Sequence, residues 1–223
     1  MRMILKASLL CWMICTGFMP YQLANAATQT NDVMSNLNLR INDLTVSLLN
    51  KDKHKSLVLY DSIQLTVEKL RHQMKNQAFD EKKYRELMMA YAWIRVISIN
   101  FKKHAWIGAA ISSNQLHATF IRFTEYTSKL QSDGAWIRYL SWDLMLLNLE
   151  DPKSNAQLLK FRRDNLISTW EDMSEILIKN FRNKSLFMAG NQLILALKKA
   201  KTPQQVIALT KKILLLMDQI KRD

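Results

Sequence analysis

VMSNLNLRINDLTVSL, residues 33–48, is the stretch that decides the fold, because its apolar side chains recur at steps of four, four, three and four. That spacing is typical of an amphipathic helix. YDSIQLTVEKLRHQM at 60–74 repeats it at three, four, three and four, after the polar connection NKDKHK at 50–55. The two stretches predict an antiparallel pair of helices that pack through their apolar stripes. The expected stripe residues are Val33, Leu37, Ile41, Leu44, Leu48, Tyr60, Ile63, Val67, Leu70 and Met74.

The middle of the chain continues the helical pattern. Asp80 fits the N-cap of a third helix, in which residues 87–99 are apolar on nearly all sides and predict a position at the centre of a bundle. A further helix is expected to run to about Leu130. SDG at 132–134 is typical of a turn, and residues 135–149 form a second helix that is apolar nearly all round.

The C-terminal part carries two helix-start signals. Ser154 with Gln157 fits a capping box, and Thr202-Pro203 with Gln205 fits an N-cap, a proline at the first helical position and a glutamine at the third. Together these patterns predict an all-α fold, an antiparallel bundle of about seven or eight helices. The tetrapeptide AWIR occurs at both 92–95 and 135–138, so a short helical-repeat solenoid is the alternative architecture.

Residues 1–26, MRMILKASLLCWMICTGFMPYQLANA, have the features of an export signal: a positively charged start, an apolar run and a small-x-small end. We expect cleavage after Ala26, which leaves 27–223 as a single helical domain in the periplasm or secreted. The apolar run is shorter than the roughly 20 residues that a spanning helix needs, so no transmembrane anchor is expected after cleavage. Cys11 and Cys15 lie in this segment, and the mature chain would therefore be free of cysteine.

Catalytic and metal-binding patterns are missing from the sequence. His54, His72, His104 and His117 do not show the spacing of metal ligands, and there is no nucleophile motif, phosphate-binding loop or dinucleotide fingerprint. We therefore expect no catalytic residues, no metal and no cofactor, and a protein that is not an enzyme. An enzyme with a dispersed acid–base site is left as a third alternative.

Charge gives the strongest indication of a binding surface. The chain has 32 basic and 19 acidic residues, a formal net charge of +13, and its C-terminal hairpin (about 184–222) is particularly basic. Such a surface attracts anionic partners, although it can also serve only to keep a protein soluble. We expect another envelope or secretion-system protein, or an anionic membrane surface, with nucleic acid less favoured. The expected contact residues are Lys184, Lys198, Lys199, Lys201, Lys211, Lys212, Lys221 and Arg222.

The two apolar central helices suggest a second kind of site. A pocket between them would hold a lipid or a small anionic ligand, and its expected lining is Trp93, Arg95, Trp136, Arg138 and Trp142. The alternative is that these tryptophans only pack in the core. Because an unpaired charge is costly in an apolar helix, we expect ion pairs for Arg95, Arg138 and Asp143.

These observations favour a non-enzymatic, exported helical protein of the bacterial envelope that acts by binding. An adaptor or accessory subunit of an envelope or secretion assembly is the first hypothesis. The alternatives are a periplasmic carrier of a lipid or small anionic ligand, held between the tryptophan-rich helices, and a secreted effector.

Overall fold

A computed structural model describes residues 33–75, 78–179 and 184–220. The chain divides into two compact units, Met1–Leu37 and Asn38–Asp223. In the first unit, residues 33–37 are described and are helical; the expected export signal at 1–26 lies outside the described residues. In the second unit the described residues form helices and connections without any strand, which confirms the all-α prediction.

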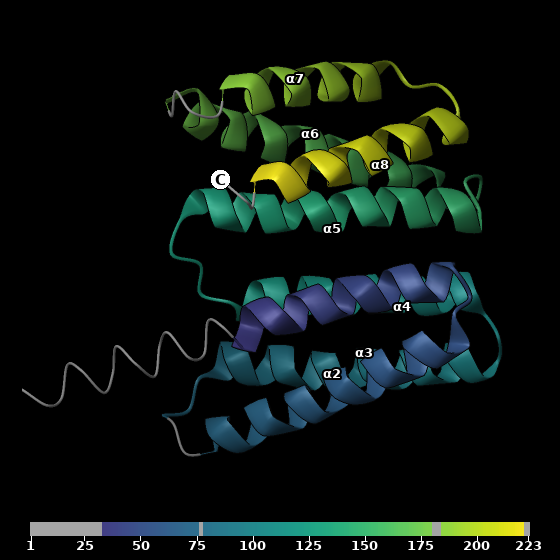
Figure 1. The fold of residues 1–223 in the computed structure, drawn as a ribbon, viewed down its shortest axis with the longest axis vertical. Helices are drawn as coiled ribbons and strands as arrows, with labels where there is room; N and C mark the ends of the chain where they lie inside the picture. Colours follow the sequence, from purple (N-terminus) through teal and green to yellow (C-terminus); the bar gives the residue numbers. More distant parts are fainter. Residues whose placement is uncertain (1–32, 76–77, 180–183, 221–223) are drawn as a thin grey trace, which may run out of the picture. The chain divides into compact units, whose positions relative to one another are not determined.

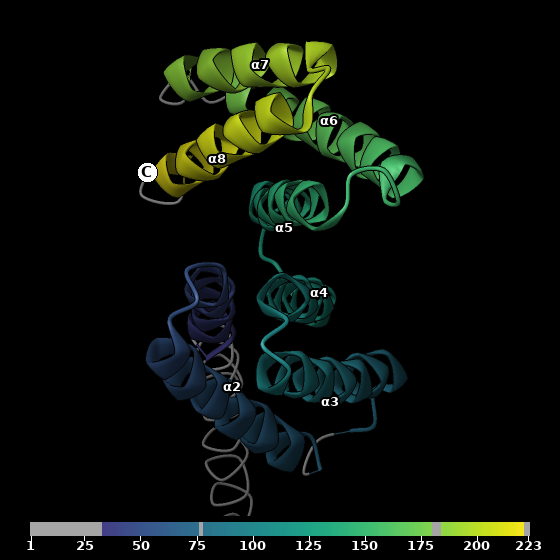
Figure 2. The ribbon, with the colours of Figure 1, turned by 90° about the vertical axis from the view of Figure 1, so that its right-hand side faces the viewer.

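The second unit is a layered helical bundle (Figure 1). Helix α4 packs between α3 and α5, and α5 contacts α6 and α8 on its other side, as Figure 2 shows. Helix α7 packs on both α6 and α8. None of the described helices is both long and apolar enough to cross a lipid bilayer. The helices are the segment 38–49, α2 (Lys53–Met74), α3 (Glu81–Lys102), α4 (Trp106–Phe123), α5 (Lys129–Glu150), α6 (Ala156–Lys179), α7 (Lys184–Lys199) and α8 (Pro203–Ile220).

The helix pair expected from the opening stretch is present. The hydroxyls of Ser47 and Ser56 lie 2.9 Å apart, and Arg40 donates to the Ser62 hydroxyl at 2.6 Å, which is the register of an antiparallel pair. Asp52 caps α2 by accepting from the backbone N–H of Lys55. The expected stripe residues Ile41, Leu44, Leu48, Ile63, Val67 and Leu70 are all buried.

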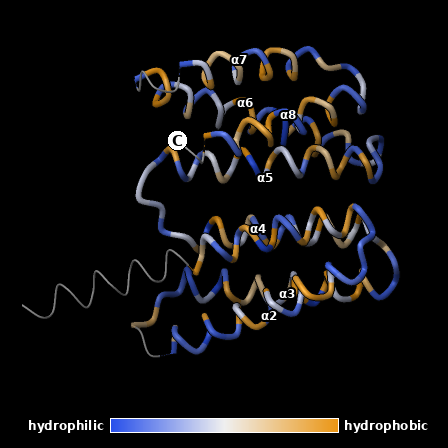
Figure 3. The backbone as a smooth tube through the Cα atoms, in the orientation of Figure 1, coloured by the Kyte–Doolittle hydropathy of each residue, from blue (hydrophilic) through white to orange (hydrophobic). Residues whose placement is uncertain are grey.

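Helix α4, and not α3, lies at the centre of the bundle, so the position predicted for residues 87–99 was wrong. Met88, Met89, Val96 and Ile99 of α3 are exposed. Two-thirds of the residues of α4 are buried, and its small side chains at 109, 110, 112 and 113 allow the neighbouring helices to approach closely. Figure 3 shows hydrophobic residues along both helices, so an apolar run such as 87–99 does not by itself identify the central helix.

The turn predicted at 132–134 was also wrong, because these residues belong to α5. Helix α4 ends at Phe123 rather than near Leu130, and Ser128 caps α5 by accepting from the backbone N–H of Gln131. Asp133 pairs with Lys129 one turn earlier at 2.6 Å. A Cβ at Gly134 would lie 3.3 Å from the Met217 methyl group, so this glycine allows α8 to pack closely on α5.

The two C-terminal cap predictions had different outcomes. Ser154 does not cap α6: its hydroxyl donates to Asp151, whose carboxylate also accepts from the backbone N–H of Lys153. The Thr202 prediction is confirmed, because its hydroxyl accepts from the backbone N–H of Gln205 and Gln205 Oε1 accepts from that of Thr202. This reciprocal cap fixes the start of α8 beside the end of α7.

Candidate anion-binding groove

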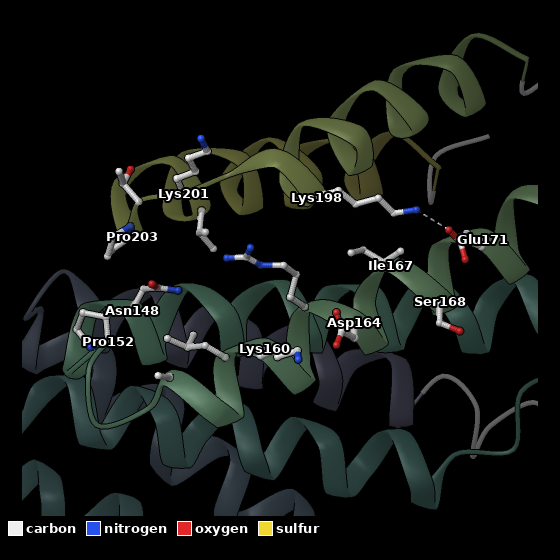
Figure 4. Close-up of a pocket in the computed structure, with 15 residues that line it drawn as sticks. Asn148, Pro152, Lys160, Asp164, Ile167, Ser168, Glu171, Lys198, Lys201 and Pro203 are labelled. Carbon is white, nitrogen blue, oxygen red and sulfur yellow. Dashed lines mark hydrogen bonds and ion pairs between the residues drawn. The ribbon is translucent and has the colours of Figure 1, made fainter.

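A groove of about 720 Å³ runs along one face of α6 (Figure 4). Residues Lys160, Arg163, Asp164, Ile167 and Glu171 recur at helical spacing, so they share that face. The opposite wall comes from the end of α7 and the start of α8, and the end of α5 closes one side. The groove is lined by Asn148, Pro152, Ala156, Leu159, Lys160, Arg163, Asp164, Ile167, Ser168, Glu171, Lys198, Lys201, Thr202, Pro203 and Val206.

Both apolar and polar groups contribute to this lining. Leu159 and Val206 are buried in the core shared by α5, α6 and α8, and Ile167 packs against that core. Asn148, Ser168 and Thr202 add uncharged hydrogen-bonding groups to the walls. The groove therefore offers both apolar contact and polar partners to an elongated ligand.

Basic groups outnumber acidic ones in the groove. Lys160, Arg163, Lys198 and Lys201 line it with only Asp164 and Glu171. Lys198 of α7 reaches across to Glu171 of α6 at 2.8 Å, as the dashed line in Figure 4 shows, so this acidic group is neutralised. With this pair set aside, three basic residues and one acidic residue remain, and this excess of positive charge favours an anionic ligand.

Arg163 is the cation least satisfied by its surroundings. Its Nη1 donates to the Ala200 carbonyl at 3.2 Å, but its Nε is buried and has no hydrogen-bond partner. Within the described ranges, Arg163 makes no ion pair with a carboxylate. A buried donor without an acceptor costs about 1–3 kcal/mol. The Nε atom is closed off from solvent, so an anion in the groove would be held by the other N–H groups of this partly exposed guanidinium.

The expected basic hairpin does not present one continuous face. Lys198 and Lys201 line the groove, whereas Lys184 and Lys199 are exposed outside it. Lys211 and Lys212 are exposed on α8 and, as neighbours, are about 100° apart around the helix axis, on either side of the exposed Leu215. Lys221 and Arg222 lie outside the described residues.

The structure does not bring together the five residues of the expected tryptophan pocket. Trp93 and Arg95 lie on α3, whereas Trp136, Arg138 and Trp142 lie on α5, and α4 packs between the two helices. Trp142 donates to Asn42 at 2.7 Å.

The ion pairs expected for three central charges form in two cases. Arg138 pairs with Asp218 of α8 and donates to the Met217 carbonyl. Asp143 pairs with Arg162 of α6 at 2.7 Å. For Arg95 the expectation was wrong: it is exposed and, among the described residues, makes no ion pair, because the outer face of α3 is open to solvent.

Asp143 is the centre of a buried polar network between α4, α5 and α6. Its carboxylate accepts from Gln115 at 3.0 Å, from Asn114 at 3.3 Å and from Arg162. Burial raises the pKa of the Asp143 carboxyl, and the neighbouring Arg162 opposes that shift. Burial and the charge of Asp143 raise the pKa of Tyr139 to about 12. This network holds the three helices in register.

A second, smaller recess lies beside this network. It has a volume of about 320 Å³ and lies between α5 and α6. Arg162 lines it but already pairs with Asp143, so its charge is largely compensated. The full lining is Trp136, Tyr139, Leu140, Arg162, Asn165, Ser168 and Thr169.

Sequence reasoning missed Lys160 and Arg163. The signal was available as the basic run KFRR at 160–163, but this run lies outside the basic hairpin expected at about 184–222. Among the described residues, no group of three histidine, cysteine or acidic side chains could hold a metal ion.

No protein-family model, curated protein or solved structure matches this chain.

Proposed function

We propose that this protein is a non-enzymatic, exported component of the bacterial envelope that acts by binding, as an adaptor or accessory subunit of an envelope or secretion assembly. Its contact surface is the basic surface formed by α6, α7 and α8. The observation that carries the proposal is the groove lined by Arg163, Lys160 and Lys201, in which Arg163 makes no ion pair among the residues that the structure describes. An acidic partner protein would supply carboxylates to these cations.

Two features support binding rather than transport of a ligand inside the bundle. The groove opens along α6, α7 and α8, and three further exposed lysines, Lys199, Lys211 and Lys212, lie outside it on α7 and α8. A partner protein can contact these groups together, whereas a small ligand cannot.

The test is capture of partner proteins from envelope extracts of the source cell by the purified chain. One variant reverses the charge of Lys198, Lys199, Lys211 and Lys212 by substitution with glutamate. A matched variant makes the same change at Lys53, Lys55, Lys82 and Lys102, which are exposed on α2 and α3. We expect the first variant to lose specific partners that the matched variant retains. Equal capture by both, with circular dichroism unchanged, would remove this surface from the proposal.

The second candidate function is a carrier of a lipid or small anionic ligand, and the observation that favours it is the recess lined by Trp136 and Tyr139. Native mass spectrometry of the chain purified from its source would then show a bound small molecule. A Thr169→Trp variant, which fills the recess and leaves the Arg162–Asp143 pair in place, would lose it. A wild-type chain that carries no small molecule would contradict this candidate.

A further inference from the structure

We propose that the groove along α6 binds a short, extended, acidic segment of a partner protein, with a carboxylate seated against Arg163. This inference rests on the proposed function and specifies the kind of partner. The length, the lining and the charge of the groove each point to this occupant.

The length of the groove fits a few extended residues. Its α6 wall runs from Ala156 to Glu171, which is roughly 22 Å at 1.5 Å per residue. An extended chain rises about 3.3 Å per residue, so the groove accommodates about seven residues.

The lining favours a peptide over an acyl chain. Asn148, Ser168 and Thr202 line the walls, and although Asn148 Nδ2 donates to the Leu144 carbonyl and the Thr202 hydroxyl accepts from Gln205, each keeps hydrogen-bonding capacity that a peptide backbone could use. An acyl chain could use none of these groups, and burying them beside it would leave that capacity unmet. Leu159 and Val206 form a largely buried apolar floor, and the partly exposed Ile167 offers apolar contact to a side chain of the segment.

The charge of the groove selects an acidic segment. The guanidinium of Arg163 has donors to spare after its bond to Ala200, and a carboxylate is the acceptor that best matches its planar geometry. Lys160 is exposed on the same face of α6, one turn away, and adds a second positive charge. The Lys198–Glu171 pair is exposed, so a ligand carboxylate can compete for Lys198 at little cost.

The experiment measures fluorescence anisotropy of a short, fluorescein-labelled peptide of alternating glutamate and leucine as the chain is added. The same peptide with glutamine in place of glutamate is the ligand control. Sodium laurate, which carries an acyl chain, is added as a competitor of the peptide. We expect the glutamate peptide to bind about tenfold more tightly than the glutamine peptide, and laurate not to displace it.

Two groove variants and one matched variant locate the binding. Arg163→Met keeps the apolar stem and removes the charge, and we expect it to weaken the glutamate peptide about tenfold. Lys160→Glu reverses a charge in the same groove. Lys160 is exposed, so this substitution should leave the fold intact. Lys199→Met removes one positive charge nearby but outside the groove, and we expect it to bind as the wild type does.

Equal loss in the Lys199 and Arg163 variants would overturn the inference, because it would show only general attraction to a basic protein. Displacement by laurate, or equal binding of both peptides, would also overturn it. If the peptide fails to bind while the charge-reversed hairpin still loses its partners, the inference falls and the proposed function stands.

Discussion

Gly190 of α7 lies directly against the indole ring of Trp170 of α6. A Cβ placed on Gly190 would lie 1.9 Å from both Cζ2 and Cη2 of that ring. Trp170 is 1% exposed, and its Nε1 donates to Asn191 of α7 at 2.8 Å. The contact fixes the distance between α6 and α7, and α6 and the end of α7 provide two walls of the groove.

Gly190→Ala should therefore destabilise the protein, although alanine is the better helix former. The buried ring cannot move away, so we expect a loss of about 3 kcal/mol in the free energy of unfolding, the upper end for an overpacked core. Gly134→Ala is the matched change in α5, where only the flexible Met217 methyl group is close. It should be neutral or stabilising by up to about 1 kcal/mol. Urea denaturation of both variants measures the difference, and equal effects would contradict the packing described here.

Asp143→Ala should be far more costly than Asp218→Ala, although each removes the partner of an arginine. Asp143 is buried, and its loss removes an acceptor of Arg162 and of Gln115 and one of the two acceptors of Asn114. Removing one partner of a buried pair costs about 3–5 kcal/mol. Asp218 is exposed, and its pair with Arg138 should contribute at most about 1 kcal/mol. Denaturant unfolding of both variants tests this, and similar losses would show that the network does not hold the bundle.

Buried His117 should make the protein less stable at mildly acidic pH. Burial, with a smaller contribution from Arg138, lowers its pKa from the usual 6.5 to about 4. Because the unfolded chain then binds the proton more readily than the folded one, stability is full above about pH 6.5 and falls as the pH drops towards 4. The loss reaches about 3 kcal/mol at the bottom of this range.

His117→Leu provides the control for this prediction. Between pH 7.5 and pH 5 the wild type should lose about 2 kcal/mol more stability than the variant does. Asp143 acts in the opposite sense, because a raised pKa stabilises the fold below its usual value of 3.8 and that contribution is lost as the pH rises. Both proteins contain Asp143, so its effect cancels in the comparison. Identical pH profiles would contradict a neutral, buried His117.

Export should remove residues 1–26. Mass spectrometry of the chain recovered from the periplasm or medium should show an N-terminus at Ala27. Ala24→Leu should reduce processing, because the cleavage site requires small residues, while Gln29→Leu outside the site should not. Recovery of the full-length chain in the cytoplasm would contradict export.

Local patterns predicted part of this fold well. The first helix pair followed from apolar spacing, and the start of α8 followed from Thr202 and Gln205, because a cap depends on residues that are neighbours in sequence. The helical course through residues 132–134 did not follow, since serine, aspartate and glycine are all common in turns, whereas in α5 the Asp133 carboxylate pairs with Lys129. The central place of α4 depends on small residues whose close packing against neighbouring helices can be recognised only in the assembled bundle.

The sequence indicated only some of the residues that line the groove. Lys198 and Lys201 were expected in a basic surface, but that surface was treated as one hairpin. Arg163 lies on a different helix, α6. The lack of a hydrogen-bond partner for its Nε can be recognised only after α6, α7 and α8 are packed together. The tryptophan pocket failed for the same reason, because identical AWIR sequences on α3 and α5 face different neighbours.

Photo-crosslinking in cells tests directly whether this protein binds a partner through the α6–α8 surface. A photoreactive amino acid replaces Ser168 in the groove or, as the control, Gln64 on the exposed face of α2. We expect a discrete protein adduct from position 168 that disappears when Lys160→Glu is added, and no such adduct from position 64. The absence of an adduct at 168, or an adduct that persists with Lys160→Glu, would contradict binding through this surface.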